Sequence, residues 1–283
     1  MKCFYHSSDL DGHCSGAIVR YRFPACELIP HNYGQPFPWE TIAPGERVFL
    51  VDLSLQPFSD MIRLDGLADL VWIDHHQSAL KDAARCGQIL PGFRAIGRAG
   101  CELTWQELFP KKDCPLAVRL LGRYDVWDHA DPRTLPFQYG MRGEDTDPRS
   151  EPARTLWASL FEENPFDFAR IYHAGEAIYG YVLEENRKYV LSGAFETQFE
   201  GRPALALNRG LTNSQVFDAL WDPEKYDLMV SFFWRKGSWT VSLFTTREDV
   251  DCSALAKKYG GGGHAQAAGF QCPALPFELT GGR

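Results

Sequence analysis

The chain has 283 residues, of which 45% are hydrophobic and 23% are charged. These proportions are typical of a globular protein with a sizeable core, and they exclude collagen-like, coiled-coil and disordered chains. With 29 Lys and Arg residues against 37 Asp and Glu residues, the net charge is −8, which argues against a protein that follows the phosphates of long nucleic acid.

The sequence gives no sign of a membrane span or of an export signal. No window approaches 18 consecutive uncharged apolar residues, and the first residues lack the apolar segment of a signal peptide. The 8 cysteines include no Cys-x-x-Cys pair, which is typical of reduced thiols rather than of a disulfide framework or a zinc ribbon. We therefore expect a cytoplasmic protein.

Short apolar runs alternate with helical stretches over the first third of the chain. Lys2–His6, Arg47–Leu53 and Leu70–Asp74 are apolar and too short for helices, and a helix is predicted over Ser15–Arg22. This alternation is typical of a parallel sheet that is buried on both faces. We therefore predict an α/β fold class for this part of the chain.

Carboxylates follow the ends of these predicted strands. Asp9 and Asp11 come after the first strand, Asp52 after the second and Asp74 at the end of the third. In open parallel sheets, ligands bind beyond the carboxyl ends of the strands. The sequence therefore predicts that these side chains converge on one site.

The second half of the chain changes character twice. Residues 151–191 have a helical pattern, and β signals then return in Ala194–Phe199, Ala204–Asn208, Leu228–Trp234 and Trp239–Thr245. A helix predicted over Cys252–Tyr259 runs into four glycines and His264. We therefore predict a parallel-sheet domain over residues 1–150, a helical linker over 151–191 and a smaller mixed-sheet α/β domain over 192–283.

Histidines accompany the carboxylates at these strand ends. Asp74 is followed by His75 and His76, a tripeptide that alone would fit equally well an Asp capping a helix beside two surface histidines. Together with His6 and Asp125 the cluster is different, because gathered carboxylates repel one another unless cations neutralise them. Mixed carboxylate and imidazole ligands suit Mn²⁺ or a similar divalent ion better than structural zinc. Two such ions that share a carboxylate would clamp a phosphate and activate a water molecule.

Five segments, in this order, resemble the motifs of the DHH phosphoesterases. They are His6–Gly12, Val51-Asp52, Asp74-His75-His76, Arg123–Trp127 and the run Gly261–His264 with Ala267–Phe270, which looks like the signature of the DHH-associated C-terminal domain. The resemblance covers almost the whole chain. It implies a two-domain phosphoesterase with its active site in the cleft between the domains.

The resemblance also implies two divalent metal ions, most simply Mn²⁺, with Mg²⁺ or Co²⁺ as alternatives. The implied ligands are His6 and Asp9 for one ion, Asp11, His75 and Asp125 for the other, and Asp52 between them. Asp74 would be a ligand or would support a histidine, and His76 would orient the scissile phosphate or protonate the leaving oxygen. Asp128 is the alternative to Asp125 in the fourth motif.

The glycine run is the predicted substrate cradle. Glycines let backbone N–H groups approach a phosphate closely, although a simple flexible turn would have the same composition. By resemblance, the substrate-binding residues are Gly262, Gly263 and His264, with Asn208 and Arg247 as further candidates. Relatives often have an Arg that grips a terminal phosphate where this chain has Phe244, with Arg247 three residues on.

The expected function is hydrolysis of short oligoribonucleotides or linear dinucleotides to mononucleotides, as in the oligoribonuclease (nano-RNase) branch of the resembled family. A cyclic mono- or dinucleotide phosphodiesterase is the alternative, and an inorganic pyrophosphatase or a non-catalytic nucleotide sensor is disfavoured. The expected partner is the short substrate, without a long nucleic-acid track or a membrane, and a homodimer is compatible with the sequence. The sequence does not distinguish RNA from DNA as the substrate, and it does not determine the base preference or the direction of attack.

Overall fold

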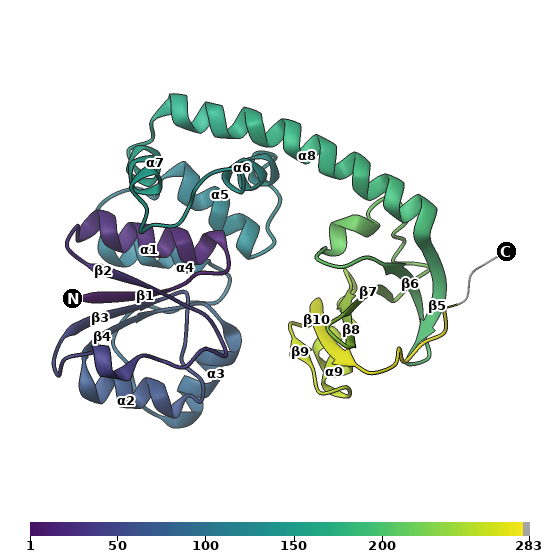
Figure 1. Cartoon of the computed structure of the whole chain (residues 1–283), viewed down its shortest axis with the longest axis horizontal. Coiled ribbons are helices and arrows are strands. Elements are labelled where there is room, and N and C mark those ends of the chain that lie inside the picture. Colours follow the sequence, from purple (N-terminus) through teal and green to yellow (C-terminus); the bar gives the residue numbers. More distant parts are fainter. Residues whose placement is uncertain (280–283) are drawn as a thin grey trace. The chain divides into compact units, whose positions relative to one another are not determined.

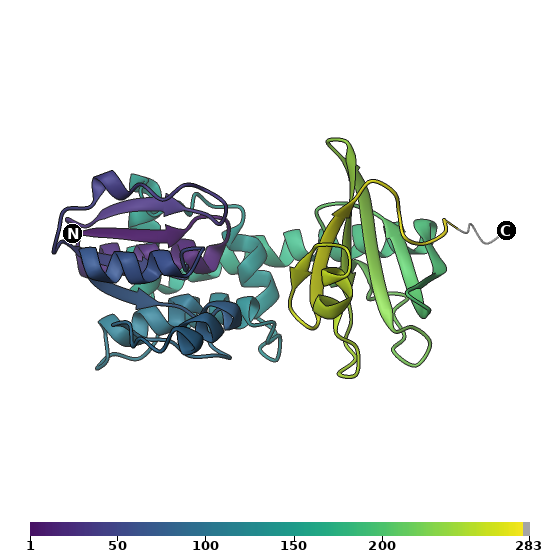
Figure 2. The ribbon, with the colours of Figure 1, turned by 90° about the horizontal axis from the view of Figure 1, so that it is seen from below.

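The chain folds into two compact units, Met1–Tyr179 and Gly180–Arg283. A computed structural model describes residues 1–279 (Figures 1 and 2). No helix in this range combines the length and the apolar character needed to cross a membrane. The α/β fold class predicted from the sequence is confirmed, with a parallel sheet in the first unit and a separate mixed sheet in the second.

The first unit is built on a parallel sheet. Its strands are β1 (Lys2–His6), β2 (Glu27–His31), β3 (Arg47–Val51) and β4 (Asp69–Ile73), in the order β2-β1-β3-β4. Strand β2 was not predicted. It contains Pro30, which cannot donate a backbone hydrogen bond and is therefore tolerated here because β2 lies at the edge of the sheet.

Helices α1 (Leu10–Arg22) and α4 (Gly100–Leu108) cover one face of this sheet, and α2 (Ser59–Leu67) and α3 (Gln77–Cys86) cover the other. Four further helices pack on the outer side of α1 and α4: α5 (Leu116–Asp125), α6 (Thr134–Met141), α7 (Glu151–Phe161) and α8 (Pro165–Gly193). A short 3-10 helix, η1 (Trp39–Thr41), follows β2. Successive strand residues point to opposite faces. Phe4 and Leu50 therefore pack with α2, whereas Tyr5 and Phe49 pack with α1 and α4, and Figure 1 shows these layers.

The helices that follow residue 150 belong to the core of the first unit. Trp157 and Phe161 of α7 and Ile171 of α8 are buried in one apolar cluster with residues of α1 and α5. Residues 151–179, which the sequence analysis placed in a helical linker, are thus helical and contribute to the packing of the first unit. The functional assignment of each domain stays a prediction.

Two element boundaries in the first unit differ from the predictions. Helix α1 begins at Leu10 rather than Ser15, because the Asp9 side chain caps its N-terminus by accepting from the Gly12 N–H at 2.9 Å. Strand β3 ends at Val51, because Asp52 has a φ of 54° and leaves the extended conformation. Both differences bring a candidate carboxylate to the edge of the sheet.

The second unit is a mixed sheet. Its strands are β5 (Ala194–Phe199), β6 (Arg202–Asn208), β7 (Leu228–Arg235), β8 (Ser238–Phe244), β9 (Gly262–Gly263) and β10 (Ala267–Cys272), in the order β5-β6-β7-β8-β10-β9, with η2 (Ser214–Phe217) and α9 (Cys252–Lys257). Ala204 and Ala206 face the cluster around α9, and Leu205 and Leu207 face Val190 of α8 and η2. The β signals in the sequence predicted β5, β6, β7 and β8, whereas β9 and β10 were missed.

Two helices of the first unit approach each other through a glycine. A Cβ atom added at Gly175 of α8 would lie 1.8 Å from the backbone oxygen of Pro136 of α6. Gly180, one and a half turns further along α8, has no atom within 4 Å of such a Cβ. The close approach fixes where α6 lies in the first unit.

We predict that Gly175→Ala destabilises the protein by about 1–3 kcal/mol, because the helices must separate to admit the methyl group. Gly180→Ala is the matched control and should stabilise the protein by about 0.4–1 kcal/mol, because alanine restricts the unfolded chain. Urea denaturation followed by circular dichroism measures both. Equal changes in the two variants would contradict the close packing of α6 on α8.

Candidate metal centre

The first part of the site lies where β1 passes into α1. His6 is the last residue of β1, and Asp9 is the capping residue of α1. The Nδ1 atom of His6 lies 3.0 Å from Oδ2 of Asp9. The strand end and the helix cap therefore place an imidazole beside a carboxylate, as the first motif predicted.

Asp11 is a buried carboxylate in the first turn of α1. Only 3% of the residue is exposed, and its two oxygens accept hydrogen bonds from the backbone N–H groups of Gly100 (2.8 Å) and Cys101 (2.7 Å). These N–H groups belong to the N-terminus of α4, where the helix dipole favours negative charge. The fold thus supplies donors for a carboxylate that burial would otherwise destabilise.

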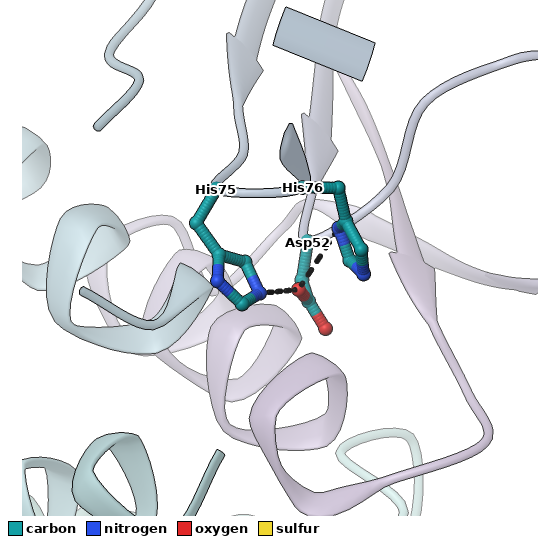
Figure 3. A group of neighbouring side chains, drawn as sticks. All are labelled: Asp52, His75 and His76. Carbon is teal, nitrogen blue, oxygen red and sulfur yellow. Dashed lines mark ion pairs between the residues drawn. The ribbon is translucent and has the colours of Figure 1, made fainter. Parts of the chain in front are cut away.

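Asp52 occupies the middle of the site (Figure 3). It follows β3 and is 1% exposed. Its Oδ1 lies 3.2 Å from Nε2 of His75 and 3.9 Å from Nδ1 of His76, and its Oδ2 lies 3.6 Å from Nδ1 of His6. One carboxylate therefore faces three imidazoles from two other strand ends.

Asp74 holds the chain that carries both histidines. It follows β4 and is fully buried. Its Oδ1 accepts from the backbone N–H groups of His75 (2.8 Å) and His76 (3.2 Å) and lies 2.7 Å from Nδ1 of His76. Of the two roles left open for Asp74, this geometry matches support of a histidine.

Helix α5 brings the last carboxylate. Asp125 ends this helix, and its Oδ2 lies 3.3 Å from Nε2 of His75, which is also 3.5 Å from Oδ2 of Asp11. Asp128 instead pairs with Arg123 at 3.6 Å and caps the backbone N–H of Ala130 at 3.0 Å. The structure therefore brings Asp125, and not Asp128, to the cluster.

These side chains form groups that could hold metal ions. In each group the candidate ligand atoms lie within 4.8 Å of one another; the groups are His6, Asp9 and Asp52; Asp11, His75 and Asp125; and Asp52, His75 and His76. Among residues 1–279, Oδ2 of Asp74 is buried without a hydrogen-bond partner, and Nδ1 of His6 and Oδ1 of Asp52 are buried and face other candidate ligands without forming a hydrogen bond of good geometry. Unpaired buried nitrogen and oxygen ligands fit a divalent ion. The individual ligand roles stay predictions.

Burial and mutual repulsion dominate the electrostatics of the cluster. Burial and the charge of Asp52 raise the pKa of Asp11 well above its ordinary value, and burial and the charge of Asp11 raise the pKa of Asp125 to about 7. Burial lowers the pKa of His6 and of His75, but the adjacent carboxylates outweigh it and raise each pKa to about 10. Without metal, protons therefore supply the neutralising charge.

Tyr33 is a neighbour of the site that the sequence analysis missed. Its ring centroid lies 5.7 Å from that of His6 and 6.0 Å from that of His76. The residue follows β2, an edge strand that the apolar pattern did not reveal. No signal in the sequence could have placed it here without that strand.

The glycine run of the second unit forms an edge hairpin. Gly262 and Gly263 make up β9, which pairs with β10, and the His264 N–H donates to the Ala267 oxygen at 2.7 Å. Gly263 has a φ of 140°, and a Cβ there would lie 2.6 Å from Ala267 O. At Gly262 a Cβ would meet no atom within 4 Å. The backbone conformation and the close contact therefore require glycine at position 263, whereas the fold does not require glycine at position 262.

The other predicted substrate residues of the second unit are less suited to the role. Asn208 is the exposed last residue of β6, and three strands separate β6 from β9 in the sheet order. Arg247 is already paired, with its guanidinium 2.8 Å from Asp249 and 3.5 Å from Asp227. Phe244 packs against the apolar cluster beneath η2, which matches a core phenylalanine rather than a base-stacking one.

Comparison with known sequences gives one distant relative. No model of a known protein family matches the chain. The chain is 25% identical over 256 residues to the uncharacterized protein R106 of Acanthamoeba polyphaga mimivirus, a match that covers 83% of this chain. It spans 56% of the length of that relative, so the relative contains sequence without a counterpart here.

Comparison with solved structures identifies the fold. The DHH domain of a member of a ribosomal protein family matches with a TM-score of 0.58 at 11% identity, covering 95% of this chain and 81% of that one. The chain has the fold of a DHH-domain protein. An exopolyphosphatase-related protein from Bacteroides fragilis (TM-score 0.55, 14% identity, 97% and 87% covered) and the pGpG-specific phosphodiesterase PggH from Vibrio cholerae (0.50, 13%, 95% and 92%) are also similar.

We predict that metal binding at this centre releases protons and tightens as the pH rises. At pH 7 the raised pKa values of His6 and His75, about 10 each, keep protons on atoms that must be free to bind a metal. Each displaced proton should tighten the apparent affinity about tenfold per pH unit. Calorimetric titration of Mn²⁺ between pH 6 and 8, in two buffers of different ionisation enthalpy, measures this.

The control for this titration is His173→Gln, which changes an exposed histidine paired with Glu176 on α8. It should leave both the proton release and the pH dependence unchanged. A Mn²⁺ affinity that does not vary with pH in the unchanged protein would contradict the protonated state of the metal-free cluster.

Proposed function

We propose that the chain is a metal-dependent phosphodiesterase of the DHH family that hydrolyses short oligoribonucleotides or linear dinucleotides to mononucleotides. One observation carries the proposal: Asp52 faces two groups of carboxylate and imidazole ligands at the carboxyl edge of a parallel sheet. The fold shared with a phosphodiesterase specific for pGpG, a phosphorylated dinucleotide, supports the substrate class. The chain's charge of −8 favours a short substrate over a long one.

Two divalent ions, with Mn²⁺ as the first candidate, fit the donor set. His6 and Asp9 would hold one ion, Asp11, His75 and Asp125 the other, and Asp52 would contact both. When bound, such ions polarise a phosphate and lower the pKa of water to near neutrality. The protein's part is to fix the ligands, and it does so with backbone N–H donors to Asp11 and to Asp74.

His76 is the proposed proton donor to the leaving oxygen. The Asp74 carboxylate faces its Nδ1 atom at 2.7 Å, so Nε2 is the nitrogen left to face the substrate. Burial lowers the pKa of His76, but Asp74 outweighs it, and the net shift is upward. A histidine whose pKa is raised and whose ring is held in one orientation can act as a general acid.

The second unit is the proposed source of substrate contacts through its glycine hairpin. Gly262 is exposed and has space around it for a side chain. The absence of a side chain at this position gives a phosphate or ribose space beside the hairpin, and His264 is adjacent in the turn. The proposal takes Gly262, Gly263 and His264 as binding residues.

We predict that Asp125→Asn lowers Mn²⁺-dependent hydrolysis of 5′-phosphorylated diadenylate by at least about 100-fold, since replacing even a residue that only supports a ligand typically costs 10–100-fold. Asp128→Asn is the matched control and should change the rate less than about threefold, because it removes only an exposed pair worth about 0–1 kcal/mol. Initial rates and bound-metal content after desalting measure both. The reverse ranking would make Asp128 the ligand.

The same assay tests the substrate class. The unchanged protein should cleave dimers faster than 24-mers, and cyclic dinucleotides and inorganic pyrophosphate more slowly than dimers. Faster cleavage of 24-mers would overturn the preference for short substrates. Faster turnover of a cyclic dinucleotide or of pyrophosphate would replace the proposed activity with that one.

We predict that Gly262→Ala lowers kcat/KM on the dinucleotide by about tenfold while the melting temperature changes by less than about 2 °C, because the methyl group meets no protein atom. Gly263→Ala should instead lower the melting temperature, since the methyl group would clash with Ala267 and the backbone φ is 140°. Differential scanning fluorimetry beside the kinetic assay separates the two effects. Unchanged kinetics in Gly262→Ala would remove the hairpin from the substrate site.

A further inference from the structure

A cavity of about 410 Å³ opens beside the metal centre within the first unit. It is lined by the candidate ligands Asp9, Asp11 and Asp125 and, from other elements, by Tyr124, Gln138 and Arg142. A volume of this size lies in the range of small-molecule sites and is several times that of a single phosphate group. The cavity therefore has room for part of a nucleotide next to the metals.

Helix α6 has a polar stripe, of which Gln138 and Arg142 line this cavity. Thr134 and Gln138 are four residues apart and Arg142 follows four residues later, so all three lie on one face of the helix. Gln138 is only 4% exposed, and its Oε1 and the Oγ1 of Thr134 are buried without a hydrogen-bond partner in residues 1–279. The remaining α6 residues are buried as well, apart from Leu135, which is partly buried. Unpaired polar atoms on a buried helix are costly unless a ligand or water meets them.

Arg142 is held in place but not neutralised. Its Nη2 donates to the Tyr124 hydroxyl at 2.9 Å, and its guanidinium lies 5.4 Å from the ring centroid of Tyr124 and 5.0 Å from that of Tyr139. Over residues 1–279 it forms no ion pair with a carboxylate. A guanidinium has five N–H donors, and the two tyrosines leave most of them open.

The other polar groups around the cavity have partners. His13 Nε2 lies 3.2 Å from the Ser7 oxygen, and its Nδ1 lies 2.9 Å from the Thr146 hydroxyl. Arg142 is the only Lys or Arg among the described residues that line the cavity. Arg247, the arginine that sequence reasoning assigned to the substrate, is occupied by Asp227 and Asp249.

We infer that Arg142 binds a terminal phosphate of the substrate in this cavity, one nucleotide away from the phosphate at the metal centre. Guanidinium groups recognise phosphate oxygens through paired, charge-assisted hydrogen bonds. The amide of Gln138 lies in the same cavity and can meet the sugar between the two phosphates. The inference rests on the proposed diesterase function and adds to it a phosphate subsite in the first unit.

The test compares diadenylate with and without a 5′-phosphate. The unchanged protein should show a higher kcat/KM for the phosphorylated dinucleotide. Arg142→Gln should lower the ratio of the two kcat/KM values by about 10- to 100-fold, the range expected for loss of a charge-assisted hydrogen bond. Arg142→Lys keeps the charge without the paired geometry and should give an intermediate ratio.

The control variant is Arg119→Gln, which removes an exposed arginine of α5 outside the cavity and should leave the ratio unchanged. An unchanged protein without preference for the 5′-phosphate overturns the inference. So does an Arg142→Gln variant that loses the same factor on both substrates, because its effect would then lie at the scissile phosphate or in the fold.

A binding experiment separates failure of the inference from failure of the proposed function. If the unchanged protein cleaves neither dinucleotide, the proposed diesterase function fails. Calorimetric titration with adenosine 5′-monophosphate and with adenosine then tests whether the cavity binds a terminal phosphate. Tighter binding of the monophosphate that is lost in Arg142→Gln and partly kept in Arg142→Lys supports it. Equal binding of both ligands, or no loss in Arg142→Gln, overturns it.

Discussion

Repulsion between buried carboxylates is the constraint on which the first unit depends. Asp11, Asp52 and Asp74 are each at most 3% exposed, and Asp9 and Asp125 lie beside them. Burying unpaired charge is among the costliest changes that a fold can make. Each carboxylate is therefore matched locally: Asp11 by two N–H groups of α4, Asp74 by the N–H groups of the segment that it supports, and Asp52 by imidazoles. The remaining negative charge is what a divalent cation would neutralise, so stability and metal binding have the same physical origin.

The topology explains why these groups meet at all. In a parallel sheet every strand ends at the same edge, so β1, β3 and β4 deliver His6, Asp52 and Asp74 to one place although the residues are far apart in sequence. Helices then add what the strands cannot: α1 contributes its cap and first turn, α4 its N-terminus and α5 its last residue. The close approach of α6 and α8 at Gly175 places the polar stripe of α6 in the same unit.

Much of this could be predicted from the sequence, because strand-end carboxylates and period-two patterns are local signals. The convergence of Asp52 and Asp74 follows from two apolar runs and the rule for parallel strands. Arg142 could not be predicted, because a charged residue after a short apolar helix looks like a solvated surface position, and only the folded chain shows that tyrosines hold it beside the cavity. For Arg247, the partners Asp227 and Asp249 were visible in the sequence, but the ion pairs that they form with it were not.

The charge distribution gives a physical reason for a short substrate. Several arginines form ion pairs with neighbouring carboxylates, as Arg133 does with Asp131 and Arg149 with Asp147. The chain also has a net charge of −8. Its surface therefore offers little attraction to a polyanion. At physiological salt, charges act over only about 8 Å. Attraction must therefore come from cations inside the site, and Arg142 lines the same cavity as three candidate metal ligands and has no carboxylate partner of its own among the described residues. A ligand with one or two phosphates could satisfy these cations, whereas the further phosphates of a long strand would approach a chain of net charge −8.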